Sequence, residues 1–330
     1  MLQFCDIFDY NINCRIIVEA YMNDPKGILD EVKKAVVGKD GVLVMALLAI
    51  LAGGHILLED IPGVGKTTMA LAFSKALSLK YNRVQFTPDV LPSDIVGFSV
   101  YNKATGAMEY KDGAILCNLF LADELNRATS RTQSALLEDM EERTVSVDGV
   151  THPVPDPFVV IATQNPVGAS GTQLLPDSQM DRFMVRLSLG YPKPSDEKEM
   201  LTRKQQGNPL EKVRCMADKG SLAAMRQECE RTYVSEKILE YIIRLNNATR
   251  NNPAILQGAS PRASLAVTSM AKAAAWVQGR DYVLPADVKL IYPATVTHRI
   301  ILTPDAEAAG RKAEALIEDI LKSVSAPVAK

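Results

Sequence analysis

The sequence predicts an α/β fold in which a parallel sheet of five strands lies between helices and is followed by a smaller all-α domain. Three observations support this prediction. Apolar runs of strand length alternate with helical patterns up to about residue 190, which is typical of a parallel sheet with helices on both faces. A glycine-rich loop joins the first run to a helical pattern. Beyond about residue 193, only helical patterns remain.

The predicted strands are the apolar runs before residue 190, namely Ile56–Leu58, Val84–Phe86, Leu119–Ala122, Phe158–Ala162 and Phe183–Leu189. Another apolar run, Val42–Ala52, is about half as long as a membrane span requires, so it predicts a buried helix. The helix that follows the glycine-rich loop is expected to bury one face, formed by Met69, Phe73, Ala76 and Leu77.

A proline-containing segment, residues 191–194, interrupts the alternating pattern and predicts a domain boundary near residue 193. We expect an N-terminal extension of unassigned role over residues 1–20, an α/β core over 21–193 and a helical domain over 194–330.

Serines are the predicted N-caps in the helical domain, because a serine hydroxyl can accept a hydrogen bond from an unpaired backbone N–H. The candidates are Ser195, Ser235 and Ser260. Pro261 follows the last of them at the first helical position, and Gly279 is predicted to end that helix. The helix after Ser235 is expected to bury four apolar side chains, Ile238, Leu239, Ile242 and Ile243.

The glycine-rich loop predicts a phosphate-binding site, and its residues are Ile61-Pro62-Gly63-Val64-Gly65-Lys66-Thr67-Thr68. Its glycines let backbone N–H groups surround a phosphate, which a helix N-terminus also attracts. Lys66 can supply charge to the β- and γ-phosphates, and Thr67 can offer a hydroxyl to magnesium. Asp60 stands where the common pattern has a further glycine. The loop nevertheless predicts binding of a nucleoside triphosphate.

Two further strand ends carry polar residues suited to phosphate chemistry. Asp123 and Glu124 follow the run Leu119–Ala122, at the edge of the sheet where ligands bind in open α/β folds. Asp123 is the predicted magnesium ligand, and Glu124 is predicted to polarise the water that attacks the γ-phosphate. Asn165 follows the run Phe158–Ala162, and its amide can orient that water; an Asn-Pro turn is the alternative interpretation.

Composition excludes several other classes of protein. The formal net charge is −2 and the pI is about 6.0, so no bulk attraction to nucleic acid or to acidic membranes is expected. The 5 cysteines show no metal-ligand spacing, and with only 3 histidines a zinc site is not expected. Asp6 and Asp9, without an early basic cluster, argue against a signal peptide. A cytoplasmic location is therefore expected.

The glycine-rich loop, the Asp123-Glu124 pair and Asn165 resemble the Walker A, Walker B and sensor 1 elements of AAA+ ATPases. The surrounding sequence resembles the MoxR family in particular. The resemblance extends from about residue 25 to about residue 320. Within it Asp60 is common, whereas Ala114 stands where the family more often has proline. The segments that carry it are Phe86-Thr87-Pro88-Asp89-Val90-Leu91-Pro92-Ser93-Asp94-Ile95-Val96-Gly97, Ala122-Asp123-Glu124-Leu125-Asn126-Arg127-Ala128, Leu175-Pro176-Asp177-Ser178-Gln179-Met180-Asp181-Arg182-Phe183 and Gly258-Ala259-Ser260-Pro261-Arg262-Ala263.

The resemblance implies ATP and Mg²⁺ as cofactors and assigns further residues. Arg182 matches the arginine finger that reaches the γ-phosphate in a neighbouring subunit. Arg262 matches sensor 2, a lid residue that responds to the nucleotide, and Val37-Gly38 matches the segment that lies against adenine. Arg127 is a weaker candidate for a contact between subunits.

The resemblance also implies partners. It implies a homo-oligomer, a ring of six, that remodels a protein client such as an enzyme receiving a metal cofactor, together with a partner that carries a von Willebrand factor A domain. Hairpins expected over about residues 92–113 and 144–152 resemble insertions that face the pore or a partner. Two alternatives stay open: the motor subunit of a magnesium or cobalt chelatase, and a DNA-remodelling AAA+ ATPase.

A GTPase is a competing interpretation, because Asp94-Ile95-Val96-Gly97 and Asn102-Lys103-Ala104-Thr105 resemble switch and guanine-binding motifs. Thr105 lacks the carboxylate that would accept the N–H donors of guanine. The two motifs are also too close in sequence to contact both a γ-phosphate and a base. A small-molecule kinase would leave the Asp123-Glu124 pair and Arg182 without a role. An ATPase is therefore the expected class.

Overall fold

The computed structural model describes residues 24–165 and 175–327, so the predicted extension over residues 1–20 lies outside the described residues. Spatial proximity divides the chain into two compact units. Among the described residues, the first comprises 24–44, 58–165 and 188–225, and the second comprises 45–57, 175–187 and 226–327. The boundary near residue 193 stays a prediction.

The sheet confirms the predicted parallel arrangement. Its strand order is β2-β5-β8-β1-β9, and β5 pairs in parallel with both β2 and β8. Asp123 ends β5 and Gln164 ends β8, so the polar residues after these strands lie at one edge. The five strands are β1 (Ile56–Glu59), β2 (Tyr81–Gln85), β5 (Leu119–Asp123), β8 (Val159–Gln164) and β9 (Val185–Leu187).

Strand β2 begins earlier than its apolar run, at Tyr81 instead of Val84. It forms one edge of the sheet, and its residues alternate between half-buried and exposed positions. An edge strand tolerates polar residues such as Asn82 and Arg83, because only part of its surface faces the core. Apolar patterning alone therefore missed the start of β2.

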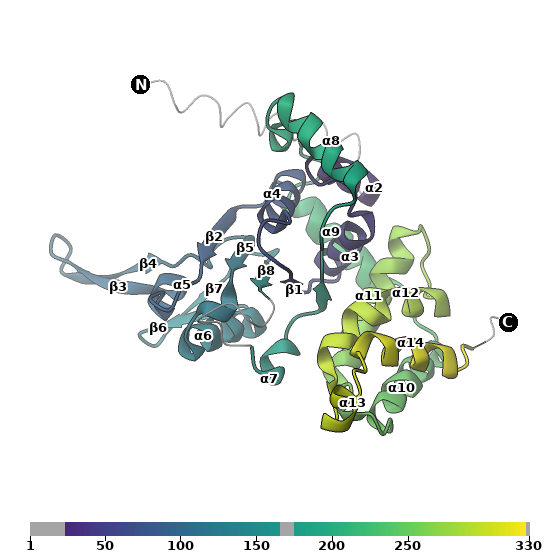
Figure 1. The fold of residues 1–330 in the computed structure, drawn as a ribbon. Helices are drawn as coiled ribbons and strands as arrows, with labels where there is room; N and C mark the ends of the chain where they lie inside the picture. Colours follow the sequence, from purple (N-terminus) through teal and green to yellow (C-terminus); the bar gives the residue numbers. More distant parts are fainter. Residues whose placement is uncertain (1–23, 166–174, 328–330) are drawn as a thin grey trace. The chain divides into compact units, whose positions relative to one another are not determined.

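From β1 to β9, helices follow the strands of the sheet along the chain as predicted, and α8, η2 and α9 then succeed one another without a strand between them (Figure 1). The predicted buried run forms α3, and the phosphate-loop helix α4 buries all four of its predicted apolar residues. No helix within the described residues has the length and apolar character needed to cross a membrane. Apart from α7 (Asp177–Met180), which belongs to the second unit, the helices up to residue 231 are α2 (Pro25–Ala35), α3 (Asp40–Leu51), α4 (Lys66–Ala76), α5 (Pro92–Val96), η1 (Leu125–Arg127), α6 (Ser130–Glu142), α8 (Pro194–Gln205), η2 (Pro209–Lys212) and α9 (Lys219–Arg231).

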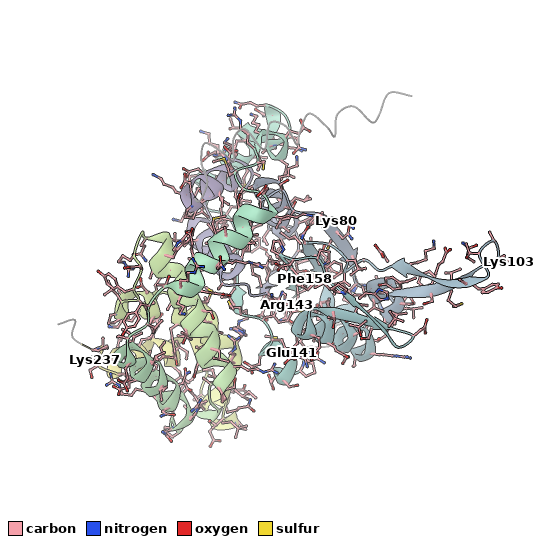
Figure 2. The ribbon with its side chains drawn as sticks, turned by 180° about the vertical axis from the view of Figure 1, so that it is seen from behind. Lys80, Lys103, Glu141, Arg143, Phe158 and Lys237 are labelled. Carbon is pink, nitrogen blue, oxygen red and sulfur yellow. The ribbon has the colours of Figure 1, made fainter. Side chains whose placement is uncertain are left out.

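Both predicted hairpins are present. The first consists of β3 (Gly97–Asn102) and β4 (Ala107–Asp112), and the second of β6 (Thr144–Val147) and β7 (Val150–Pro153). In Figure 1 the β3–β4 hairpin extends well beyond the strands of the sheet, and Figure 2 shows Lys103 at its tip. Its length therefore exposes side chains that the sheet cannot cover.

The second unit is mainly helical. Ser260 is the N-cap of α11, where its hydroxyl accepts a 3.3 Å hydrogen bond from Ala263 N, and Gly279 follows the end of that helix as predicted. The elements are α7 (Asp177–Met180), α10 (Glu236–Arg250), β10 (Ile255–Gln257), α11 (Pro261–Val277), α12 (Pro285–Val296), η3 (Thr297–Arg299), β11 (Ile301–Leu302), α13 (Pro304–Ala308) and α14 (Ala313–Ser323).

Two predictions about helices were wrong in detail. Ser195 is not an N-cap, because α8 begins at Pro194 and Lys193 holds that position. Ser235 does hold the N-cap position of α10, but Leu239 and Ile243 are 41% and 50% exposed. The buried stripe of α10 instead follows helical spacing through Ile238, Tyr241, Ile242 and Leu245, and an apolar pattern alone could not place its edge.

Candidate nucleotide-binding site

The phosphate loop has the strand–loop–helix context that its sequence predicts. It leaves β1 and enters α4, which begins at Lys66. Gly63 and Gly65 have φ values of 85° and 99°, a region that side-chain-bearing residues rarely adopt. Open space lies where a Cβ of either glycine would stand. The backbone can therefore approach a phosphate closely at both positions.

Lys66 is buried behind the loop. Its Nζ donates to the Asp60 carbonyl at 2.7 Å and to Asn165 Oδ1 at 3.2 Å. Burial lowers the pKa of Lys66 from its ordinary value. The carboxylates of Asp60, Asp123 and Glu124 oppose that shift in its pKa. The ammonium is thus held among oxygen atoms, at the position where it can contact phosphates.

A continuous chain of hydrogen bonds joins the residues predicted at the strand ends. Asn165 Nδ2 donates to Glu124 Oε1 at 3.3 Å, which extends the contact between Asn165 and Lys66. Glu124 N donates to Thr163 Oγ1 at 2.8 Å, and that hydroxyl donates to Asp123 Oδ1 at 2.7 Å. Lys66 at the start of α4, the pair Asp123-Glu124 at the end of β5 and Asn165 after β8 therefore share one site.

Sequence reasoning missed several partners of these residues. Thr163 bridges Asp123 and the Glu124 backbone, as described above. Asn126 Nδ2 donates to the Asn165 carbonyl at 3.2 Å, and Asn165 N donates back to Asn126 Oδ1 at 3.4 Å. Asn126 stands inside a quoted segment and Thr163 directly follows the run Phe158–Ala162, so their positions were visible but their roles were not. Asn126 fixes the orientation of the Asn165 backbone, and Thr163 links the Asp123 carboxylate to the Glu124 backbone.

Two arginines contact the acidic residues. Arg83 on β2 forms an ion pair with Asp123 Oδ2 at 2.7 Å, and Arg127 forms one with Glu124 Oε2 at 2.8 Å. Arg127 was predicted as a contact between subunits; within the chain it holds the candidate base. The Glu124 carboxylate is therefore held from two sides, by Arg127 and by Asn165.

Magnesium would find suitable donors here. Mg²⁺ prefers oxygen ligands and is commonly held by one or two carboxylates or hydroxyls together with substrate phosphates. The Thr67 hydroxyl belongs to the first turn of α4, the Asp123 carboxylate ends β5, and α4 packs against β5. The donor set therefore fits a magnesium ion that shares its coordination with a bound nucleotide.

Asp60, the departure from the common loop pattern, has a structural role. Asp60 is buried, with 5% of the residue exposed. Its carboxylate accepts 2.9 Å hydrogen bonds from Ser188 Oγ and Gly190 N and a third from Leu189 N. Glycine could make none of these bonds. Asp60 thus ties the start of the phosphate loop to the segment that follows β9.

Replacing Asp60 by glycine should therefore destabilise the fold although it restores the common pattern. We expect Asp60→Gly to lose roughly 1.5–3 kcal/mol or more, the value of a hydrogen bond to a charged group. The midpoint of urea unfolding measures the loss. Asp60→Asn, which keeps one acceptor oxygen, should lose less. Equal stability of all three proteins would contradict the structural role.

The candidate adenine segment, Val37-Gly38, lies between α2 and α3. Val37 is buried, and Lys39 Nζ donates to the Tyr191 carbonyl at 2.9 Å. This bond holds the segment beside the chain that leaves β9. The segment after β9 thus contacts Lys39, which follows the candidate adenine segment, and Asp60, which precedes the phosphate loop.

Arg182 and Arg262 both belong to the second unit and line the same pocket, of about 320 Å³. Asp181 also lines this pocket, and its carboxylate accepts from Ser260 Oγ at 2.9 Å and from Arg299 Nε at 2.7 Å. His298 also lines this pocket, and burial lowers the pKa of its imidazole well below the ordinary value. The predicted finger and sensor therefore share one surface.

The GTPase interpretation has no support in the geometry. Asp94 accepts a 2.9 Å hydrogen bond from Leu91 N and caps the short helix α5. Asn102 Oδ1 accepts from Ala104 N at 2.8 Å in the turn of the β3–β4 hairpin. Both motifs are thus explained by local structure.

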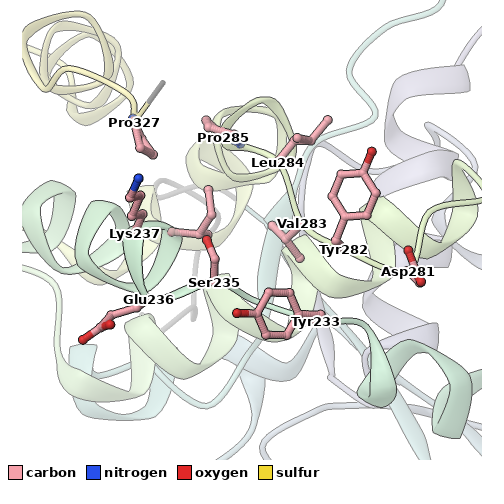
Figure 3. A pocket seen from close by; sticks show the side chains of 11 residues that line it. Tyr233, Ser235, Glu236, Lys237, Asp281, Tyr282, Val283, Leu284, Pro285 and Pro327 are labelled. Atoms are coloured by element: carbon pink, nitrogen blue, oxygen red, sulfur yellow. The ribbon is translucent and has the colours of Figure 1, made fainter. Parts of the chain in front are cut away.

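A hollow of about 810 Å³ lies elsewhere, where α10 and α12 begin (Figure 3). Tyrosine, proline and charged side chains line it, among them Tyr233, Tyr282 and Pro285. It contains none of the residues predicted to bind nucleotide. The residues predicted to bind phosphate lie instead around the loop of the first unit.

Two family models and several known proteins match this chain. Residues 55–185 match the family described as "ATPase family associated with various cellular activities (AAA)", and residues 247–320 match the AAA lid domain. The chain is 42% identical over 313 residues to protein YeaC of Bacillus subtilis, covering 94% of this chain and 98% of that protein. It is 39% identical over 306 residues to Chaperone MoxR1 of Mycobacterium tuberculosis, covering 90% and 81%.

A solved structure of a proposed ATPase from Cytophaga hutchinsonii superposes with a TM-score of 0.86 at 40% identity, covering 96% of this chain and 98% of that one. The phosphate loop, the paired acidic residues and the helical lid together define an AAA+ ATPase. Within that class, the chain belongs to the MoxR family.

Proposed function

We propose that this protein hydrolyses ATP with Mg²⁺ and acts, as a ring of six copies, on a protein client. The observation that carries this proposal is the hydrogen-bond chain from Lys66 through Asn165 and Glu124 to Thr163 and Asp123. It brings a phosphate-binding cation, a candidate base and a candidate magnesium ligand to one edge of the sheet.

Each residue then has a role in phosphoryl transfer. Residues Pro62 to Thr68 surround the phosphates, Lys66 neutralises part of their charge, and Thr67 and Asp123 hold Mg²⁺, which supplies further charge when bound. Glu124 takes the proton of the attacking water, and Asn165 orients that water. Because Asn165 and Arg127 already bind the Glu124 carboxylate, its position is set before substrate enters.

The remaining assignments concern the nucleotide and its neighbours. Val37 and Gly38 lie against adenine, Arg262 responds to the bound nucleotide, and Arg182 reaches the γ-phosphate held by an adjacent copy. In a ring, Arg182 of one copy supplies a second cation to the site of the next copy. Transfer of the γ-phosphoryl group benefits from such a cation.

A protein client fits the exposed side chains of the β3–β4 hairpin. Tyr101 and Met108 lie directly opposite each other across its strands and are 58% and 62% exposed. Phe98 and Val100 are also exposed. Exposed apolar side chains on a projecting hairpin are typical of contacts with other proteins. The chaperone name of the mycobacterial relative supports the same class of client.

The biological setting is proposed from the family. We expect a partner with a von Willebrand factor A domain and a client that receives a metal cofactor, acting in the cytoplasm. The motor subunit of a magnesium or cobalt chelatase is the second candidate, and a DNA-remodelling ATPase is less well supported because the net charge is −2. A neighbouring gene for a von Willebrand domain favours the first, tetrapyrrole genes the second, and replication genes neither.

Lys66→Ala tests the nucleotide site. We expect ATP binding, measured by calorimetry, to be lost or strongly weakened, because the phosphates lose the ammonium group of the loop. Lys75→Ala is the matched control: Lys75 lies on the same helix, and its Nζ donates to the Leu210 carbonyl at 3.1 Å. Undiminished affinity in Lys66→Ala, or a clear preference for GTP in the unmodified protein, would contradict the proposal.

A further inference from the structure

We infer that Arg299 is a positioning residue for hydrolysis, which holds the backbone on both sides of Arg182 in one fixed geometry. The inference rests on the proposed function, in which Arg182 contacts phosphates bound by a neighbouring copy. It assigns a purpose to a buried arginine on η3 that the proposed chemistry does not otherwise use.

The Arg299 side chain is 3% exposed, and its guanidinium has five N–H donors. Nε donates to Asp181 Oδ1 at 2.7 Å, and Nη2 donates to the carbonyls of Asp181 and Phe183 at 3.2 and 2.8 Å. Nη1 donates to the Met184 carbonyl at 3.1 Å and to the Thr295 carbonyl. Four of these five acceptors belong to residues 181–184, so Arg299 binds mainly the residues around Arg182.

Two neighbours complete the arrangement. His298 Nε2 shares the Phe183 carbonyl at 2.9 Å. Ser260 Oγ donates to Asp181 Oδ2 at 2.9 Å while it caps α11, the helix that carries Arg262. The segment with Arg182 is therefore attached both to η3 and to the start of α11.

These hydrogen bonds matter because an arginine finger stabilises the γ-phosphate only when its guanidinium is correctly placed. A misplacement of about 1 Å by a residue far from the chemistry can cost about 10²-fold in rate. A lysine at position 299 would keep the charge but has three donors and no planar fork, so it cannot satisfy all five acceptors. The loss should fall on the rate of hydrolysis and leave nucleotide binding nearly unchanged.

Arg299→Lys tests this inference in the full-length protein. We expect kcat to fall about 10- to 100-fold, with ATP affinity within a few-fold of the unmodified protein. Mixed with Lys66→Ala subunits, which keep an intact Arg182, the variant should regain part of its activity. Mixed with Arg182→Ala subunits it should regain none, because both variants are defective in the same half of the shared site.

Arg280→Lys is the matched control. Arg280 also lies in the second unit and pairs through two nitrogens with a buried carboxylate, that of Asp287, at 2.6 and 2.8 Å. It should keep its hydrolysis rate apart from any loss of folded protein. If Arg299→Lys does not fold, Ser260→Ala removes one bond to Asp181 and leaves the ion pair; we then expect the same mixing pattern with a smaller loss. Thr303→Ala, at the N-cap of α13, controls for the lost cap.

The outcomes separate this inference from the proposed function. A normal rate in the folded variants would overturn the inference, as would a loss that Lys66→Ala subunits fail to restore. The mixture of Arg182→Ala with Lys66→Ala serves as reference. If the reference regains activity and the Arg299→Lys mixture does not, the positioning role alone is wrong. If the reference itself regains nothing, the shared site fails and the inference with it.

Discussion

Arg182→Ala should lose most of its ATP hydrolysis, up to about 10³–10⁵-fold, while its affinity for ATP stays within a few-fold. The physical reason is that the finger stabilises negative charge that develops on the phosphoryl group in the transition state. Calorimetry measures the affinity, and phosphate release measures the rate. Arg186→Ala is a nearby control on β9, where Arg186 pairs with Glu314 at 3.0 Å.

Mixing variants tests whether Arg182 acts between copies. Lys66→Ala lacks the loop cation and keeps the finger, whereas Arg182→Ala has the opposite defect. When the two are mixed under conditions of subunit exchange, some interfaces combine an intact loop with an intact finger, and activity should partly return. No return despite demonstrated exchange would place the action of Arg182 within its own chain. A monomer active at full rate would remove the catalytic reason for a ring.

Glu124→Gln should bind ATP but hydrolyse it about 10²–10⁴-fold more slowly, the usual loss for a positioned general base. The amide keeps the shape of the side chain and can still accept the hydrogen bond that Asn165 donates to it. The amide NH2 cannot accept from Arg127, so the loss combines the missing proton acceptor with the lost Arg127 ion pair. Single-turnover hydrolysis measures it, and size exclusion with ATP should show the assembled ring.

The control for this substitution is Glu138→Gln, on the exposed face of α6. It should hydrolyse ATP at the normal rate. If Glu124→Gln does so as well, Glu124 serves only to hold Arg127 and Asn165 in place. The proton acceptor would then have to be sought elsewhere at the same strand ends, with Asp123 as the next candidate.

Local patterns predicted the chemistry of the first unit well. Phosphate loops need glycines, a lysine and a hydroxyl at fixed spacing, so Gly63, Gly65, Lys66 and Thr67 could be identified without a structure. The buried strands β5 and β8 each contain a run of four apolar residues, so their ends could be placed within a residue or two. Because parallel strands end at one edge, the proximity of Asp123 and Asn165 followed from the order of the elements.

The sequence by itself thus determined the fold class, the phosphate loop and the acidic pair, because each depends on residues that are neighbours in the chain. Tertiary structure alone decided the contacts across the chain. Asp60 meets residues 188–190, and Arg299 meets residues 181–184; both pairings join segments more than a hundred positions apart. A buried carboxylate or guanidinium is stabilised only by the particular groups that the fold brings to it, and no local pattern records which groups those are.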